Sequence, residues 1–225
     1  PQYVLDRAAL RAAAPDLVLT QDLCRVGALP EATVTEALDD LGLDAAVLTV
    51  DPHTLDDVLD AIVAVARAAG ADTAGTALVA GLQDRLTTID DAVEGRARPR
   101  VLALEWTDPP YLPGHWVPAM VRRAGGEPLA GIDGGRSVAT TWEDVRADPP
   151  DVVLVAPCGF GLDAAVDQAE AIRDQVPGTP LIAVDSASYV VRAGPRLVDG
   201  IEAIAHALHP DAVPAPPPGR AQVLG

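Results

Sequence analysis

Residues 151–184 of the chain, DVVLVAPCGFGLDAAVDQAEAIRDQVPGTPLIAV, decide the fold class. The stretch opens with DVVLVA at 151–156, a short apolar run typical of a buried strand. A helical pattern follows at 162–175, and a second apolar run, LIAV, follows at 181–184. A strand, a helix and a strand in this order form a βαβ unit with parallel strands. The stretch therefore predicts an α/β protein.

The same alternation continues on both sides of this unit. Further strands are expected at 16–20, 45–50 and 101–106, and helices at 6–14, 31–41, 54–69, 73–93 and 116–124. Thr141, with Asp144 three residues on, is expected to cap a short helix, and Pro195 starts a last helix that runs to about Leu208.

Two helical patterns in the middle of the chain separate two α/β units. In the first pattern, Thr54 and Asp57 have the spacing of a capping box. Its apolar stripe contains Val58, Ile62, Val65 and Ala69, and Gly70 ends it. The apolar face of the second pattern is expected to contain Leu78, Leu82, Leu86 and Ile89.

The domain organisation follows from these elements. We expect an N-terminal lobe at 1–70, a connecting helix at 71–98 and a C-terminal lobe at 99–210. A Pro-rich tail at 211–225 is expected to be disordered. The N-terminal lobe has only two clear strands, fewer than an independent sheet needs, so this lobe is expected to be incomplete. The fold expected is thus two Rossmann-like lobes joined by a long helix, with a ligand cleft between them.

Composition narrows the classes of partner. The 225 residues carry 33 acidic and 16 basic side chains, a formal net charge of −17, and every basic residue is Arg. A chain this acidic is repelled by phosphate backbones and anionic lipid surfaces, so no nucleic acid is expected as partner. No apolar run approaches the length of a membrane span, and no signal peptide is visible. Cys24 and Cys158 lie far apart and are expected to be two reduced thiols.

Loops that follow strands are the expected ligand contacts, because open α/β sheets bind ligands at the carboxyl ends of their strands. After the strand at 16–20, Gln21 can bond a ligand amide, or this loop with Cys24 is only a polar helix entry. After the strand at 101–106 comes a Pro-stiffened loop with Trp106, Tyr111, His115 and Trp116. Either it forms a contact surface for a large flat ligand, or it is an aromatic plug between the lobes.

The remaining loops of this kind carry small, aromatic and cationic residues. Cys158 and Phe160 follow the strand at 151–156, and Ser188, Tyr189, Arg192 and Arg196 precede the last helix. The two arginines suit phosphate, carboxylate or amide groups, or they form local ion pairs on the surface. His115 has no accompanying cluster with metal-site spacing, so no metal site is predicted.

Catalytic patterns are missing from the sequence. There is no G-x-S-x-G elbow, no Walker loop and no H-E-x-x-H, and Gly159 and Gly161 lack the spacing of a dinucleotide fingerprint. Cys158 with His115 as base is the one arrangement of nucleophile and base that remains open. We therefore expect a binding protein rather than an enzyme, with no catalytic residue and no catalytic cofactor.

A family resemblance rests on five segments: PDLVLTQDLC at 15–24, LEWTDPPYLPGHWVPAMVRRAGGE at 104–127, TTWEDV at 140–145, PDVVLVAPCGF at 150–160 and SYVVRAGPRLVDGIE at 188–202. Together with the long helical connection they resemble the helical-backbone class of ABC-transporter substrate-binding proteins. Within that class they are most similar to the cobalamin-binding branch.

The resemblance implies that two lobes clamp cobalamin or another corrinoid and deliver it to an ABC-transporter permease. Tyr111 matches a ring-contacting aromatic, and Arg192 with Ser188 and Tyr189 matches a segment that reaches the corrin side chains. Asp6 and Glu143 match the carboxylates, one per lobe, that dock on the permease. Trp106, His115, Trp116, Cys158 and Phe160 lie in the matching cleft loops.

Several alternatives remain open from the sequence. A ferric siderophore or haem is a second ligand class for the same fold, and a cytoplasmic corrinoid-handling role is an alternative to a periplasmic or cell-surface location. An enzyme of the nitrogenase-like type needs more cysteines than two. A degenerate fragment that binds nothing is the last alternative. A monomer is expected, because each lobe buries its own apolar face.

Overall fold

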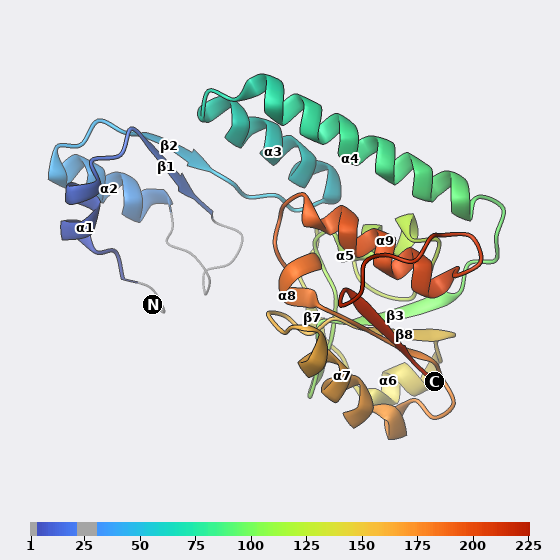
Figure 1. The fold of residues 1–225 in the computed structure, drawn as a ribbon. Coiled ribbons are helices and arrows are strands. Elements are labelled where there is room, and N and C mark those ends of the chain that lie inside the picture. Colours follow the sequence, from blue (N-terminus) through green and yellow to red (C-terminus); the bar gives the residue numbers. More distant parts are fainter. Residues whose placement is uncertain (1–3, 22–30) are drawn as a thin grey trace.

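The first lobe is a small α/β unit in a computed structural model that describes residues 4–21 and 31–225. It contains α1 (Arg7–Ala13), β1 (Leu17–Thr20), α2 (Glu31–Leu41) and β2 (Ala46–Thr49). The two strands pair in parallel, with Leu17 opposite Ala46, and neither contains a buried residue. Figure 1 shows this lobe at one end of the molecule.

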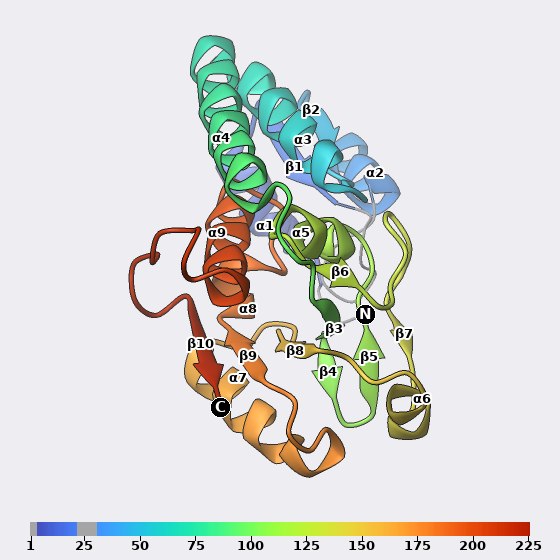
Figure 2. The ribbon, with the colours of Figure 1, turned by 90° about the vertical axis from the view of Figure 1, so that its right-hand side faces the viewer.

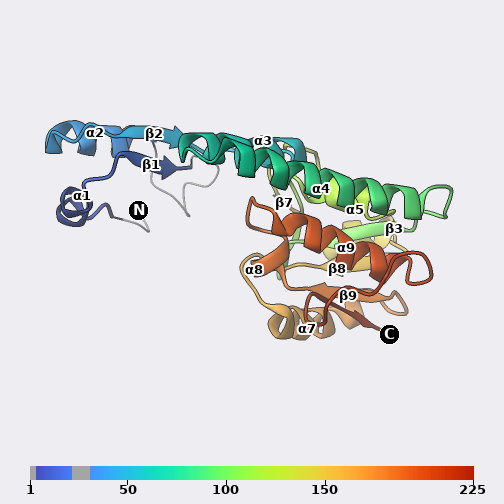
Figure 3. The same ribbon diagram turned by 45° about the horizontal axis from the view of Figure 1, so that its top comes forward.

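A helical hairpin, formed by α3 (Leu55–Ala68) and α4 (Asp72–Val93), connects the first lobe to the rest of the chain. Thr54 and Asp57 cap α3 with the reciprocal hydrogen bonds of a capping box, as the sequence predicts. Gly70, whose φ is 69°, makes the turn between the helices. Figures 1 and 3 show α4 running from the first lobe across the top of the second.

The second lobe contains a five-stranded sheet in the order β10-β9-β8-β3-β6. Its central strands β3 (Arg100–Leu104), β8 (Val152–Val155) and β9 (Leu181–Val184) are parallel, as the opening βαβ stretch predicts. Parallel β6 (Glu127–Pro128) and antiparallel β10 (Ala221–Leu224) form the edges. The mixed α/β fold class predicted from the sequence is thus confirmed.

Helices cover both faces of this sheet (Figure 2). The helices of the second lobe are α5 (Val117–Arg123), α6 (Trp142–Ala147), α7 (Leu162–Ala171) with the 3-10 turn η1 (Arg173–Gln175), α8 (Ser186–Tyr189) and α9 (Arg196–Leu208). Alternate residues of β3 point to opposite faces, so Val101 and Ala103 pack with α5 and α9. Leu102 and Leu104 pack with α6 and α7 on the other face.

The helical hairpin belongs to the core of the second lobe. Leu55, Val58 and Leu59 of α3, and Val79, Leu82, Leu86, Ile89 and Val93 of α4, are buried in one cluster with α5, α9 and the sheet. The sequence pattern misplaces one residue here, because Leu78 is 44% exposed and its neighbour Val79 is buried instead. The buried face of α4 is therefore rotated slightly from the apolar face that the sequence predicts.

Short strands beyond the predicted ones complete the lobe. The predicted strand at 101–106 ends at Leu104, and Trp106 opens a separate three-stranded sheet. That sheet contains β4 (Trp106–Thr107), β5 (Pro110–Leu112) and β7 (Val138–Ala139).

The prediction of a disordered tail is wrong, because β10 pairs along β9 with Leu224 opposite Leu181. Backbone hydrogen bonds to β9 order the end of the chain.

Gly75 provides a test of how closely the hairpin is packed. A Cβ atom at this position of α4 would lie 2.3 Å from the Cβ of Ala66 in α3, whereas one at Gly81 would meet nothing within 4 Å. We expect Gly75→Ala to lower the free energy of unfolding by about 1–3 kcal/mol through overpacking. Gly81→Ala, the matched control in the same helix, should raise it by about 0.5–1 kcal/mol. Urea denaturation of both variants measures the difference, and equal effects would contradict the close contact.

Candidate ligand-binding site

The carboxyl ends of β3, β8 and β9 form one edge of the second lobe, which we call the rim. Glu105 and Trp106 follow β3, Pro157 and Cys158 follow β8, and Asp185 follows β9. The backbone N–H of Cys158 donates to the carbonyl of Glu105 at 3.0 Å, so the first two loops are joined. Parallel α/β sheets bind ligands at this kind of edge.

Three aromatic side chains on the rim form what we call the aromatic platform: Trp106, Tyr111 and Phe160. Trp106 pairs with Tyr111 across β4 and β5, so both side chains stand on the same face of that sheet. They are 36% and 37% exposed. The ring of Phe160 meets Trp106 edge-on, with 5.4 Å between centroids. Exposed aromatic faces held on paired strands offer a rigid apolar contact surface.

Trp116 has a different environment from Trp106. Its side chain is 4% exposed, and its indole N–H donates to the carbonyl of Val190 at 2.7 Å. The two interpretations of the aromatic loop therefore apply to different residues. Trp106 and Tyr111 present a surface, whereas Trp116 fixes the start of α5 against the end of α8. The sequence-based prediction that Trp116 contacts the ligand stays a prediction, and the burial of its side chain does not support it.

Glu105 holds the loops of the rim together, and sequence reasoning missed it. The Ser137 hydroxyl and the backbone N–H of Gly114 both donate to its carboxylate. Burial raises the pKa of Glu105, while these two hydrogen bonds act to lower it. A Cβ atom at Gly114 would lie 2.4 Å from the carbonyl oxygen of Gly135, so only glycine fits there. The carboxylate thus fixes a closely packed pair of loops.

His115 lies between these loops and the end of the first lobe. Its φ of 51° is left-handed, and its backbone N–H donates to the Gly135 carbonyl at 2.7 Å. The ring lies 6.2 Å from the ring of His53, which follows β2 and which sequence reasoning did not select. Burial, then the charges of His53 and Arg136, lower the pKa of His115, and Asp51 opposes them. The residues described contain no group of three or more His, Cys, Asp or Glu side chains that could hold a metal ion.

The segment before α9 lines a pocket of about 220 Å³, which we call the cationic pocket. Its lining residues are Ala187, Ser188, Arg192, Gly194, Pro195 and Arg196. The structure thus brings three of the sequence-predicted residues to one place. The backbone N–H of Ala187 donates to the Phe160 carbonyl at 3.0 Å, so this pocket adjoins the aromatic platform. Tyr189 lies beneath the guanidinium groups of Arg196 and Arg220, 5.6 and 5.5 Å from its centroid.

An apolar cavity of about 420 Å³ lies beside the cationic pocket. It extends from Val50 at the end of β2, along the α3 stripe that contains Val58, Ile62 and Val65, to Ala193. Gly194 and Pro195 line both spaces. The α3 stripe predicted from the sequence therefore faces a cavity as well as the core. Apolar walls next to a few polar groups are typical of sites for small molecules.

The other sequence-predicted residues lie away from the cationic pocket. Gln21 is exposed at the end of β1, and Cys24 lies outside the described residues. Asp6 caps α1, because its carboxylate accepts the N–H groups of Ala8 and Ala9. Glu143 is exposed in the first turn of α6. Their ligand-binding and docking roles stay predictions.

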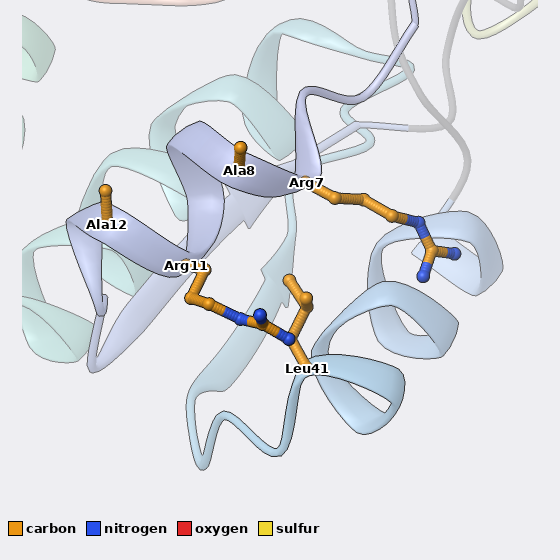
Figure 4. Close-up of a pocket in the computed structure, with 5 residues that line it drawn as sticks. All are labelled: Arg7, Ala8, Arg11, Ala12 and Leu41. Atoms are coloured by element: carbon orange, nitrogen blue, oxygen red, sulfur yellow. The ribbon is translucent and has the colours of Figure 1, made fainter.

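A further pocket, of about 400 Å³, lies in the first lobe between α1 and the end of α2 (Figure 4). Arg7, Arg11 and Leu41 line it together with two alanines. Arg7 is paired with Asp40 at 2.6 Å. None of the residues predicted from the sequence lines this pocket, and it lies on α1 and α2 rather than on the rim.

Comparison with known proteins identifies the family. A family model described as periplasmic binding protein matches residues 9–184, and the chain therefore belongs to this family of substrate-binding proteins. No curated protein matches the chain. In the part of the chain that the structure describes, no helix is long and apolar enough to cross a membrane.

Solved structures extend the comparison. The periplasmic haem-binding protein RhuT from Roseiflexus sp. RS-1 is 25% identical, with a TM-score of 0.67 over 94% of this chain and 82% of that one. A periplasmic haem-binding protein from Pseudomonas aeruginosa is 21% identical, with a TM-score of 0.73 over 100% and 82%. The vitamin B12-binding protein BtuF of Vibrio cholerae is 17% identical, with a TM-score of 0.64 over 92% and 79%. The last two support the fold alone.

Removing the Glu105 carboxylate should loosen the rim. In Glu105→Ala the Ser137 hydroxyl and the Gly114 N–H lose their acceptor, so we expect the free energy of unfolding to fall by about 1–3 kcal/mol. Glu105→Gln keeps an acceptor oxygen and should lose less. Urea denaturation measures these changes, with exposed Glu36→Ala as a control expected within about 0.5 kcal/mol of the parent. An equal, small effect of all three changes would contradict the role of Glu105.

The lowered pKa of His115 predicts a dependence of stability on pH. The unfolded chain binds this proton more readily than the folded chain, so the free energy of unfolding should fall as pH drops through about 6.5. His115→Asn removes the proton site, and Asn tolerates the left-handed backbone. The loss of stability between pH 7.5 and pH 5.5 should therefore be smaller in the variant, as measured by urea denaturation. His53→Asn, which removes one cause of the shift, should give an intermediate loss, and identical losses in all three proteins would refute the prediction.

Proposed function

We propose that this protein captures a metal tetrapyrrole, specifically cobalamin or a related corrinoid, and delivers it to an ABC-transporter permease. The observation that carries the proposal is the exposed aromatic platform, which adjoins the cationic pocket on the rim of the parallel sheet. The membership in the periplasmic binding protein family supports the binding and delivery role.

The chemistry of the ligand suits these surfaces. A corrin ring has broad apolar faces and a rim of amide groups. The exposed faces of Trp106 and Tyr111 can stack on the ring, and stacking adds to the gain from apolar burial. The guanidinium groups of Arg192 and Arg196 can donate to oxygens at the ring edge. The apolar cavity beside them can take methyl groups from the ring periphery.

Haem is a second candidate, and two observations favour it. RhuT, a periplasmic haem-binding protein, is 25% identical to this chain. The half-buried imidazole of His115, beside the rim loops and His53, is also a side chain that can ligate iron. The motifs around Trp106 and Arg192 favour the corrinoid, so we place it first.

The family also supports proposals about location and partners. A periplasmic or cell-surface location fits the family, and the permease is the expected partner. Asp6 and Glu143 remain the proposed docking carboxylates, one on each lobe. The capping role of Asp6 means that its substitution also weakens α1, so a docking test needs Glu143→Ala beside it. We propose that the protein is a monomer.

Tryptophan fluorescence during a cobalamin titration tests the proposed function. We expect saturable quenching that comes from Trp106, since Trp116 is buried and hydrogen-bonded within the protein. Trp106→Phe should lose most of the quenching yet keep an aromatic face and most of the affinity. Tyr111→Ala should weaken binding by roughly tenfold, because one aromatic contact is lost.

Controls separate the candidate ligands. Trp142→Phe, which changes a tryptophan of α6 outside the platform, should leave both quenching and affinity unchanged. Haem and a ferric siderophore are titrated in parallel, and equilibrium dialysis measures binding without fluorescence. Saturable binding of haem without cobalamin would replace the first candidate with the second. Binding of neither tetrapyrrole would refute the proposed function.

A further inference from the structure

The loop between α9 and β10 is rich in proline and is fixed to the second lobe at both ends. Four of its residues at 214–218, PAPPP, are proline, and we call this segment the proline strap. Before the strap, Val213 is 5% exposed, and its carbonyl oxygen lies 2.8 Å from Nδ1 of His206. After the strap, ion pairs hold Arg220 on α9, and β10 pairs with β9. Figure 2 shows the loop, in red, at the surface of the lobe.

Proline sets the backbone conformation of the strap in advance. The proline ring holds φ near −65° and removes the backbone N–H donor. The residue before a proline is driven into the extended region, and Val213, Ala215, Pro216 and Pro217 each precede one. These restrictions favour polyproline II, a left-handed helix with three residues per turn and no internal hydrogen bonds.

The exposure of the strap has the period of such a helix. Val213 is buried, and Pro216, three residues on, is half-buried. The other four residues of the strap are exposed: Pro214, Ala215, Pro217 and Pro218. With three residues per turn, positions three apart lie on one ridge. The ridge that contains Val213 and Pro216 therefore faces the lobe, and the ridge that contains Pro214 and Pro217 faces solvent.

The outward ridge suits a partner with an aromatic groove. Val213 belongs to the core of the lobe, whereas Pro214 and Pro217 belong to neither hydrophobic cluster of the described residues. They have the P-x-x-P spacing of segments that dock in aromatic-lined grooves. Such segments bind because their helix is already formed and loses little conformational entropy. The anchored ends of the strap strengthen this preorganisation.

Charge narrows the kind of groove that fits. Arg220, the nearest arginine to the strap in the sequence, is 14% exposed and pairs with Asp199 and Glu202. Its charge is therefore not available to a partner. A groove with an acidic rim would also be repelled by a chain whose formal net charge is −17. A groove with a neutral or basic rim is not repelled in this way.

We infer that the proline strap is a docking segment for a partner protein whose groove is lined by aromatic side chains and has a neutral or basic rim. Pro214 and Pro217 enter the groove, and Pro216 stays against the lobe. This interaction is separate from ligand capture at the rim, because the strap lines neither the cationic pocket nor the apolar cavity.

Two groove domains serve as probes for the full chain in calorimetric titrations. One is a WW domain with a neutral or basic groove rim, and the other is an SH3 domain with an acidic groove rim. We expect saturable binding of the first and no binding of the second. Pro214→Ala and Pro217→Ala should each weaken binding by about tenfold, since each loses an inserted ring and a fixed φ. Pro216→Ala, the matched control, loses only the fixed φ and should weaken binding by about twofold.

The outcomes test the partner and the docking mode separately. Binding of only the acidic groove, or of neither groove, would overturn the proposed partner. Equal losses of affinity in all three variants would overturn the assignment of the outward ridge. Urea denaturation of each variant shows whether a loss of affinity is a loss of fold. Because neither probe involves the rim, the result does not depend on which ligand the protein captures.

Discussion

The packing of α4 on the second lobe is the interaction on which the rest of the molecule depends. Leu82, Leu86 and Ile89 of α4 are buried in the same core as α9 and one face of the sheet. At about 25 cal/mol per Å² of buried apolar surface, such contacts are the main source of stability. Because α3 is held closely on α4 at Gly75, both helices are fixed relative to the rim. The apolar cavity between α3 and Pro195 exists because the hairpin is fixed there.

A network of ion pairs also connects α4 to the helix that begins at the cationic pocket. Arg85 reaches from α4 to Asp199 and Glu202 on α9, and these carboxylates hold Arg220 from the tail. The expected disordered tail is therefore a structural part of the site, since Arg220 lies over Tyr189 and β10 completes the sheet. Partly buried ion pairs of this kind contribute little net stability, but they fix positions.

Elements with a clear period were predictable from the sequence, and elements without one were not. The helix at Glu31–Leu41, the strand at Leu181–Val184 and the cap at Thr54 occur where their patterns place them. Strands of two or three residues, such as β4 and β7, are too short to show alternation. β10 follows a Pro-rich stretch, and only its partner β9 shows that Ala221–Leu224 is a strand.

The same limit applies to the site. Strand-end loops identified the neighbourhood, because parallel topology brings such loops together whatever their spacing in the chain. Glu105 and His53 were missed, since a single acid or histidine has no pattern until its partners Ser137 and His115 are placed around it. Tertiary packing also decides that Trp106 is exposed and Trp116 is buried, and the sequence around the two tryptophans does not predict this difference.

The net charge of −17 sets the long-range potential in which the rim and the cationic pocket lie. Over distances beyond a Debye length of about 8–10 Å the protein repels a small anion, so two arginines attract one only at contact. Under the proposed function, a ligand with a broad apolar ring gains affinity first from Trp106, Tyr111 and Phe160, and this apolar burial offsets the long-range repulsion. The exposed platform is therefore the part of the rim that has to supply most of the binding free energy of such a ligand.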